Sequence, residues 1–294
     1  MEQFLHQIIN GISLGSIYAL VALGYTMVYG IIKLINFAHC DIYMIGAYVG
    51  YFCMTFLGIG FVPSLLAAMA VCTVLGVTIE KIAYKPLRNA TRIAVLITAI
   101  GVSLFLEYGT MFFVKAQVRS YPPLTGLLAK TLQLGNISVP MLQVLILAIT
   151  IILMLLLQFV VNKTKIGKAM RAVSMDQDAA ELMGINVDTT ISFTFALGSA
   201  LAGAAGILVG VCYNSINPLM GVLPGLKSFV AAVFGGIGII PGAMIGGYII
   251  GIVEVLISGY INSMYRDAFV FAILILILIL KPAGLLGKNT REKV

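Results

Sequence analysis

Apolar segments of about 20 residues recur along this chain and leave little room for anything else. Hydrophobic residues make up 61% of the 294 residues and charged residues only 10%, whereas soluble domains carry about 25% charge. A helix needs roughly 20 apolar residues to cross a bilayer. The sequence therefore predicts an all-α polytopic membrane protein with about eight or nine membrane segments, some of them short or broken, in a single domain over residues 1–294.

Short polar or basic breaks divide the chain into nine predicted segments. They are Ile8–Ile32, Asn36–Leu57, Phe61–Tyr84, Ile93–Val114, Met141–Val161, Thr189–Tyr213, Leu226–Phe234, Ala243–Ser258 and Ala268–Leu280. Leu226–Phe234 is short for a spanning helix, so it either crosses the membrane or re-enters it. Irregular backbone at membrane depth is tolerated only against protein or along a water-filled path.

The basic residues sit at the ends of apolar segments, which sets the expected orientation. Lys85–Arg92, the loop 162–188 and the tail from Lys281 gather Lys and Arg, so the positive-inside rule places them in the cytoplasm. The loop Lys115–Pro140 and the N-terminus then lie outside. This placement accounts for the net charge of +7 without a basic, aromatic-interleaved surface of the kind that binds nucleic acid.

Small residues recur at intervals of four in two later segments. The stripes are Gly198, Ala202, Gly206 and Gly210, then Gly242 and Gly246, and Gly247 and Gly251. Such stripes let helices approach closely in lipid. They fit either a tightly packed single bundle or a face between subunits.

One polar interruption, Asn162–Asp188, stands out between two long apolar segments. Its first half is basic and its second half acidic. Ser174 precedes Gln177 by three residues, a capping-box pattern that predicts a helix start, and Gly184 is suited to end that helix. A helix this short is marginal in water and must pack on something: a partner protein, or its own bundle and the lipid surface.

The second half of this interruption also carries a family motif. Asp178-Ala179-Ala180-x-x-x-Gly184 resembles the Glu-Ala-Ala-x-x-x-Gly loop of ABC importer permeases, with Asp in place of Glu. Nearly the whole chain then resembles the branched-chain amino acid permeases of the LivH type. The matching motifs are Asn36-Phe37-Ala38-His39, with Cys40 where glycine is usual, Gly167–Val173, Phe195–Gly203, Gly225–Phe229, Gly235–Gly238 and Pro241–Ala243.

The resemblance implies a multi-pass permease subunit of the cell inner membrane in an ATP-driven importer. It implies three kinds of partner: a second homologous permease, two cytoplasmic ATPases that bind the ATP, and an external substrate-binding protein. The expected ATPase-coupling residues are Ser174, Asp176, Asp178, Ala179, Ala180, Glu181 and Gly184. Relatives with these motifs carry urea or short amides, which remain alternative substrates. A stand-alone secondary transporter is a further alternative.

The sequence predicts no cofactor, metal site or enzymatic activity. The two histidines, His6 and His39, lie far apart without clustered Cys or carboxylates, and the usual metal sites need such clusters. Gly287-Lys288 is followed by Asn289 rather than the Ser or Thr of a phosphate-binding loop. No acid–base pair at helical spacing suggests an intramembrane enzyme.

Polar residues inside the membrane are costly and are by default functional candidates. The possible translocation-pathway residues are Asn36, His39, Lys227, Gly235 and Gly236. We expect His39 to make a hydrogen bond at a helix end and Lys227 to extend to the outer interface. We expect Glu107 and Glu254 to pair with Lys or Arg on neighbouring helices.

Overall fold

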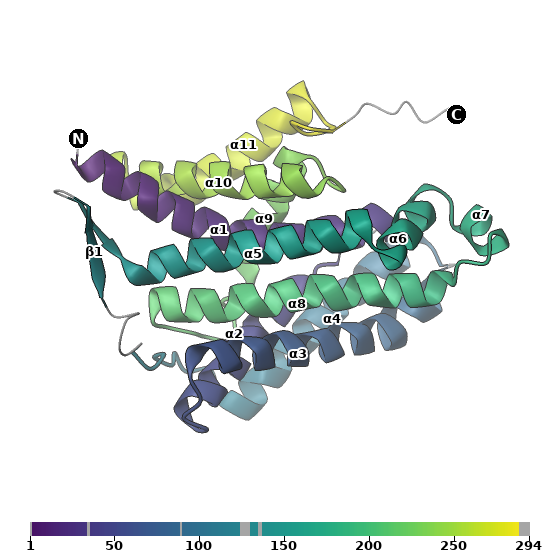
Figure 1. Cartoon of the computed structure of the whole chain (residues 1–294), viewed down its shortest axis with the longest axis horizontal. Coiled ribbons are helices and arrows are strands. Elements are labelled where there is room, and N and C mark those ends of the chain that lie inside the picture. Colours follow the sequence, from purple (N-terminus) through teal and green to yellow (C-terminus); the bar gives the residue numbers. More distant parts are fainter. Residues whose placement is uncertain (1, 34–35, 89, 124–129, 135–136, 288–294) are drawn as a thin grey trace.

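The structure is a bundle of long helices that run roughly parallel or antiparallel to one another (Figure 1). This computed structural model describes residues 2–33, 36–88, 90–123, 130–134 and 137–287. The N-terminal end of α1 and the strand β1 lie at one end of the bundle, called the outer end below, and α6 and α7 lie at the opposite, inner end (Figure 1). The N-terminal end of α1 and the polar interruption were predicted to lie on opposite sides of the membrane, and the structure places them at opposite ends of the bundle.

The helices follow the predicted segments with small shifts at their ends. They are α1 (Glu2–Ile32), α2 (His39–Thr55), α3 (Phe61–Ile79), α4 (Arg92–Val114), α5 (Met141–Lys163), α6 (Lys165–Met175), α7 (Gln177–Leu182), α8 (Val187–Tyr213), α9 (Val222–Gly235), α10 (Ile240–Tyr260) and α11 (Arg266–Leu280). Within the described ranges, seven segments are long and apolar enough to cross a membrane, and α2 and α9 are shorter. The predicted all-α polytopic membrane fold is confirmed, and the two shorter helices α2 and α9 stand where the remaining short segments were predicted.

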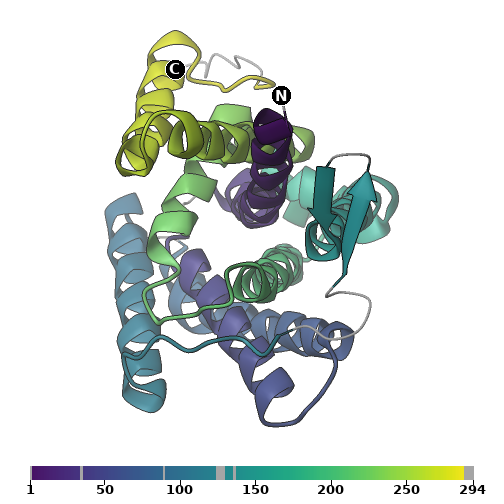
Figure 2. The same cartoon turned by 90° about the vertical axis from the view of Figure 1, so that its left-hand side faces the viewer.

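The core of the bundle forms around α1, which most other helices touch. Viewed along the helices, α1 lies inside the bundle with α10 beside it, whereas α4 and α11 lie at the edge (Figure 2). Most of α1 and α8 is buried, and most of α11 is exposed. The small-residue stripe explains the contact between α1 and α10, because a Cβ at Gly251 or Gly247 would meet the backbone of Gly15 or Ala19. The predicted close approach through small residues is therefore made within this chain.

The short helices α2 and α9 begin inside the bundle rather than at its surface. Gly221 and Gly225, before and within α9, pack directly on Cys40 in the first turn of α2. With 14 residues and a rise of about 1.5 Å each, α9 is only about 21 Å long, short of the roughly 30 Å hydrocarbon core. The sequence left open whether this segment crosses the membrane or re-enters it. The structure shows a short helix that begins within the bundle and ends at the inner end, so α9 alone does not span the membrane.

Two local structures were not predicted. The connection expected to be a polar loop contains an antiparallel hairpin, β1 (Thr131–Leu134) with β2 (Ile137–Pro140). Before the hairpin, Tyr121 inserts among the helices and donates a hydrogen bond to the Ala47 carbonyl at 2.6 Å, and burial raises the pKa of the Tyr121 phenol. At the inner end, α3 continues as a π-helical turn over Glu80–Tyr84 and a 3-10 turn over Lys85–Leu87.

Candidate functional site

The polar interruption folds into two helices, not one. α6 doubles back on the end of α5: Gly167 packs on the backbone of Val160 and Val161, and Arg171 donates a hydrogen bond to the Val161 carbonyl. The buried side of α6 is formed by Met170 and Val173. α6 is thus anchored to the bundle, and α7 extends beyond it at the inner end (Figure 1).

The predicted start of the short helix at Ser174 is wrong. Ser174 lies in the last turn of α6, where its hydroxyl donates to the Arg171 carbonyl at 2.7 Å. The residue that caps α7 is Asp176, whose carboxylate accepts from the Ala179 amide at 3.0 Å. The predicted end is confirmed, because Gly184 has a φ of +81°, the left-handed conformation that closes a helix.

The surface of α7 combines acidic and apolar side chains. Of the expected coupling residues, Ala180 is buried against the bundle, while Asp176, Asp178, Ala179, Glu181 and Gly184 are exposed. Beside them Leu182 is 89% exposed and Met183 83% exposed. Exposed large apolar side chains of this kind mark a surface that contacts another protein or the membrane.

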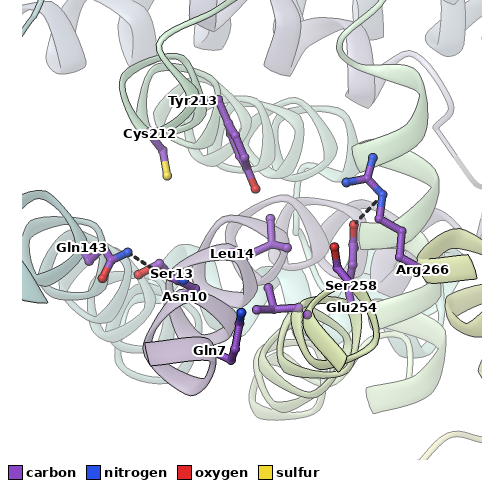
Figure 3. A pocket seen from close by; sticks show the side chains of 12 residues that line it. Gln7, Asn10, Ser13, Leu14, Gln143, Cys212, Tyr213, Glu254, Ser258 and Arg266 are labelled. Carbon is purple, nitrogen blue, oxygen red and sulfur yellow. Dashed lines mark hydrogen bonds and ion pairs between the residues drawn. The ribbon is translucent and has the colours of Figure 1, made fainter. Parts of the chain in front are cut away.

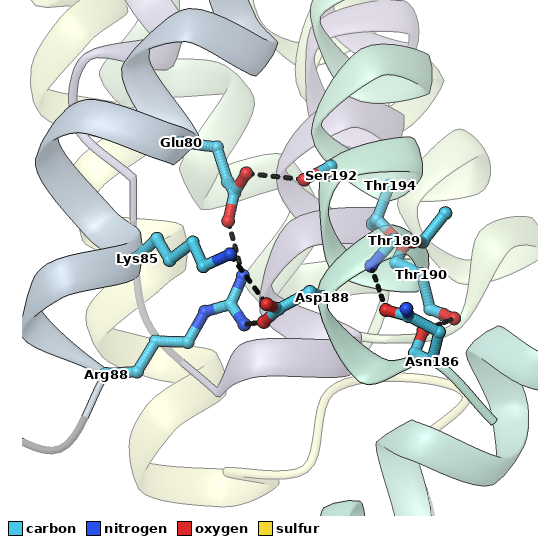
Figure 4. Close-up of polar contacts among 9 residues, drawn as sticks. All are labelled: Glu80, Lys85, Arg88, Asn186, Asp188, Thr189, Thr190, Ser192 and Thr194. Atoms are coloured by element: carbon cyan, nitrogen blue, oxygen red, sulfur yellow. Dashed lines mark hydrogen bonds and ion pairs between the residues drawn. The ribbon is translucent and has the colours of Figure 1, made fainter. Parts of the chain in front are cut away.

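A cluster of four charges joins the inner ends of α3 and α8 (Figure 4). Arg88 pairs with both Glu80 and Asp188, Lys85 Nζ lies 2.6 Å from Asp188 Oδ2, and the Ser192 hydroxyl donates to Glu80 at 2.6 Å. We call Glu80, Lys85, Arg88 and Asp188 the inner cluster. Since Asp188 follows α7 by six residues, the inner cluster ties the chain that leaves α7 to α3.

Four of the five expected pathway residues are packed against neighbouring helices. Asn36 accepts a hydrogen bond from the Tyr84 hydroxyl at 2.7 Å, and Gly235 and Gly236 pack on the backbone of Gly242 and of the segment 283–287. The ring of His39 packs against Tyr25 in a tilted arrangement, with centroids 4.8 Å apart and an interplanar angle of 59°. The expected helix-end bond of His39 is not found in the described part of the chain: the ring lies against Gly24 of α1, and its Nε2 atom has no hydrogen-bond partner there.

Lys227, the fifth residue, does not extend to the interface as expected. It is only 3% exposed, and its Nζ lies 2.6 Å from Glu254 Oε1 and 2.6 Å from Asp267 Oδ1. Arg266 Nε lies 3.8 Å from the same Glu254 oxygen, and the Tyr18 hydroxyl donates to the other at 2.8 Å. We call Lys227, Glu254, Arg266 and Asp267 the outer cluster. The expectation that Glu254 pairs with a basic residue is confirmed.

Glu107 has a different neighbour from the one expected. It is buried beside Asp41, and Asp41 accepts a hydrogen bond from the Ser103 hydroxyl at 2.5 Å. The neighbour of Glu107 is thus an acid, not the predicted Lys or Arg.

The outer cluster borders two adjoining cavities at the outer end. The first, of about 400 Å³, is shown in Figure 3 with Glu254 and Arg266 on one side and Cys212 and Gln143 on the other. The second, of about 380 Å³, also contains Lys227, and we call it the charged pocket. Its remaining lining residues are Leu14, Tyr18, Tyr43, Val209, Tyr213, Ser215, Asn217, Met220, Leu223 and Pro224. A cavity of this size accommodates a small molecule.

Sequence reasoning missed several members of both clusters. Glu80 was included in the predicted apolar segment Phe61–Tyr84 and was not named as a candidate. An acidic residue inside a membrane segment is itself a sign of a functional or structural role. Arg266 and Asp267 were assigned to a connection before the last segment. Tyr18 and Tyr43 carry no local sequence signal, because only the fold brings these residues to the charged pocket.

Comparison with known proteins identifies relatives along nearly the whole chain. Residues 7–278 match the sequence model of a family described as "Branched-chain amino acid transport system / permease component". The chain is 43% identical to the LivH high-affinity branched-chain amino acid transport permease of Escherichia coli, over 99% of this chain and 98% of that protein. It is 40% identical to BraD of Pseudomonas aeruginosa over the same shares, and 31% identical to a probable LivH of Methanocaldococcus jannaschii, over 94% of this chain and 90% of the relative.

Proposed function

The chain belongs to the family of branched-chain amino acid transport permease components, and from this premise we propose that it is the membrane permease subunit of an ATP-driven importer for leucine, isoleucine and valine. The named activity of its relatives supports this substrate class. In this proposal residues 1–294 form one membrane domain in the cell inner membrane. The chain has no ATPase site and no cofactor of its own.

The proposed partners follow from this role. A second, homologous permease completes the membrane part, an external binding protein delivers the amino acid, and two cytoplasmic ATPases bind and hydrolyse ATP. The coupling loop 162–188 contacts an ATPase. Ser174 remains in the proposed coupling segment as the end of α6, where it borders a cavity at the inner end together with Met175.

The observation that carries the coupling role is the exposed surface of α7. Leu182 and Met183 are exposed beside the exposed acids Asp178 and Glu181. α7 is also too short to be stable alone in water. A cleft on an ATPase would bury the apolar side chains and pair with the acids. Movement of the ATPases would then reach α8 through the inner cluster and α5 through α6.

The coupling role is tested by co-purification. The complete transporter carrying Gly184→Val, Asp178→Lys or Leu182→Asp is extracted from membranes through a tag on this chain, and the bound ATPase is quantified. We expect all three variants to lose most of the ATPase, because Gly184→Val strains a left-handed position and the other two place charge in the interface. Leu219→Asp, an exposed leucine at the outer end, is the matched control and should retain it. Normal ATPase recovery with all three variants would refute the coupling role.

The transport role is tested in vesicles that contain the complete transporter. Uptake of labelled leucine should require ATP, both ATPases and the binding protein. Uptake that persists without the ATPases would favour a secondary transporter, and uptake of labelled urea or a short amide instead of leucine would favour the other substrate class.

A further inference from the structure

We infer that the charged pocket binds the transported amino acid as a zwitterion, with Glu254 facing its ammonium group and Lys227 and Arg266 facing its carboxylate. This inference rests on the proposed transport function. It assigns to this chain a substrate-binding site within the membrane domain, distinct from the α7 surface, and it names the residues that recognise each end of the substrate.

Charge provides the first support. Charges of both signs meet at one wall of the pocket, with Lys227 and Glu254 nearly fully buried and Arg266 about half exposed. Burying an ion costs several kcal/mol unless it is paired. A substrate with one cationic and one anionic group can bind here without leaving a charge unpaired. Its ammonium group pairs with Glu254 while its carboxylate pairs with Lys227 and Arg266. A ligand with a single charge would leave one wall charge unpaired.

The apolar part of the lining fits a branched aliphatic side chain. Leu14, Val209, Met220 and Leu223 line the same cavity as the charges. Ligand pockets of a few hundred Å³ typically combine an apolar lining with a few placed polar groups. Here the charged groups come from α9, α10 and α11, and the apolar ones come from α1, α8 and the segment 220–224, so an amino acid can be held by both ends at once.

An unused hydroxyl group points to a missing partner. Tyr43 lines the charged pocket and is only 1% exposed, yet its hydroxyl has no hydrogen-bond partner among the described residues. Buried hydroxyl groups nearly always have one. A substrate carboxylate in the pocket supplies an acceptor for this hydroxyl, as Glu254 already does for the hydroxyl of Tyr18.

The position of the pocket fits a first binding step in a path along α1 and α9. The same two helices line a cavity of about 420 Å³ at the inner end, through Tyr29, Gly30 and Val233. Between the two cavities, Tyr25 packs on His39 and on Phe229, with centroid distances of 4.8 and 5.9 Å. These aromatic contacts lie on the stretch of α1 and α9 that separates the charged pocket from the inner cavity.

Direct binding tests the inference. The purified complete transporter in nanodiscs, without the external binding protein, is titrated with labelled L-leucine. We expect saturable binding, in which unlabelled leucine competes at least about tenfold better than isocaproate, which lacks the ammonium group, or isoamylamine, which lacks the carboxylate. Hydrogen bonds to charged groups are worth about 1.5–3 kcal/mol, which corresponds to about tenfold or more in affinity.

Variants assign the binding to this pocket. The paired change Lys227→Met with Glu254→Gln removes both buried charges together, so no single charge is left unpaired, and should weaken leucine binding at least about tenfold. Tyr43→Phe should weaken it by a smaller factor. Tyr48→Phe is its matched control, because Tyr48 lies on the same helix with an equally buried, unpartnered hydroxyl and does not line the pocket; it should bind leucine like the wild type.

The outcomes separate this inference from the proposed function. Equal competition by isocaproate would identify an anion or lipid site, and unchanged leucine binding in the paired variant would place the substrate elsewhere. If wild-type vesicles take up leucine but the nanodiscs show no saturable binding, the pocket inference is wrong and the transport function stands. If the nanodiscs bind leucine but ATP-driven uptake fails, the proposed function is wrong and the pocket stands.

Discussion

The inner and outer clusters have the same charges and different surroundings. Each contains two acids and two bases, and in each one acid also accepts a hydrogen bond from a hydroxyl group, Ser192 for Glu80 and Tyr18 for Glu254. Glu80 is completely buried between α3 and α8. Glu254 borders two cavities of about 400 and 380 Å³. The inner cluster therefore acts as a structural connection, whereas the outer cluster has space beside it for a ligand.

The largest effect should come from Arg88→Met. Arg88 is the one cation paired with Glu80 in the described part of the chain, so its removal leaves a fully buried carboxylate unpaired. Breaking a buried pair in this way costs about 3–5 kcal/mol, and we expect a strongly lowered thermal unfolding temperature in detergent. Lys85→Met is the control, because both partners of that pair are half exposed and such pairs contribute about 1 kcal/mol or less. Equal losses in the two variants would mean that burial does not distinguish these contacts.

Lys227→Met should lower the free energy of unfolding by about 1–3 kcal/mol. This loss is smaller than the one expected for Arg88→Met. Glu254 keeps the Tyr18 hydroxyl and has Arg266 at 3.8 Å, and water can enter the adjoining cavity to solvate it. The same unfolding experiment measures this difference. A loss as large as that of Arg88→Met would show that the outer cluster is also mainly structural and would break the comparison.

A smaller, local effect should follow Asp176→Ala at the α7 start. Loss of the cap costs about 1 kcal/mol, and a difference of this size changes an opening equilibrium by a factor of about five. The Ala179 amide, which now donates to Asp176, should exchange its hydrogen about that much faster. Ser174→Ala should leave this exchange rate unchanged, because the Ser174 hydroxyl bonds within α6. Faster exchange of the Ala179 amide in the Ser174 variant would mean that Ser174 caps α7, as the sequence predicted.

The smallest perturbation is a thiol reagent applied from the outer side. Cys212 lines the cavity next to the charged pocket (Figure 3), while Cys40, Cys53 and Cys72 are buried in the bundle. We expect a small, water-soluble reagent to modify Cys212 and to leave the other three intact, as measured by peptide mass, with Cys212→Ala as the control. Modification of Cys72 at a similar rate would mean that water reaches far beyond the outer cavities.

The extent of the helices could be predicted because it depends on local composition. Predicted starts at Met141 and Ile93 agree with the structure to within one residue, since apolar runs and basic ends directly reflect the cost of exposing backbone and charge in lipid. The hairpin over residues 131–140 was missed because strands of four residues leave too short a pattern to recognise. Gly184 was recognised correctly because a left-handed helix end is a property of one residue and its neighbours.

The partners of buried charges could not be predicted from the sequence alone. Lys227 meets Glu254 and Asp267 because α9, α10 and α11 pack together, and no local pattern records that packing. Tertiary packing also decides whether Ser174 or Asp176 caps α7. Both residues are suitable helix starts, and the docking of α6 on α5 decides that Ser174 stays within α6.

The formal charges of the outer cluster, Lys227 and Arg266 against Glu254 and Asp267, sum to zero. Moving one elementary charge through a membrane potential of about 100 mV changes its energy by about 2.3 kcal/mol, but a neutral cluster that accepts a zwitterion adds no net charge to the moving part. The electrical potential of the cell should thus neither assist nor oppose the binding of leucine in the charged pocket. In the proposed importer, accumulation would then depend on the ATPases and would persist in a depolarised membrane.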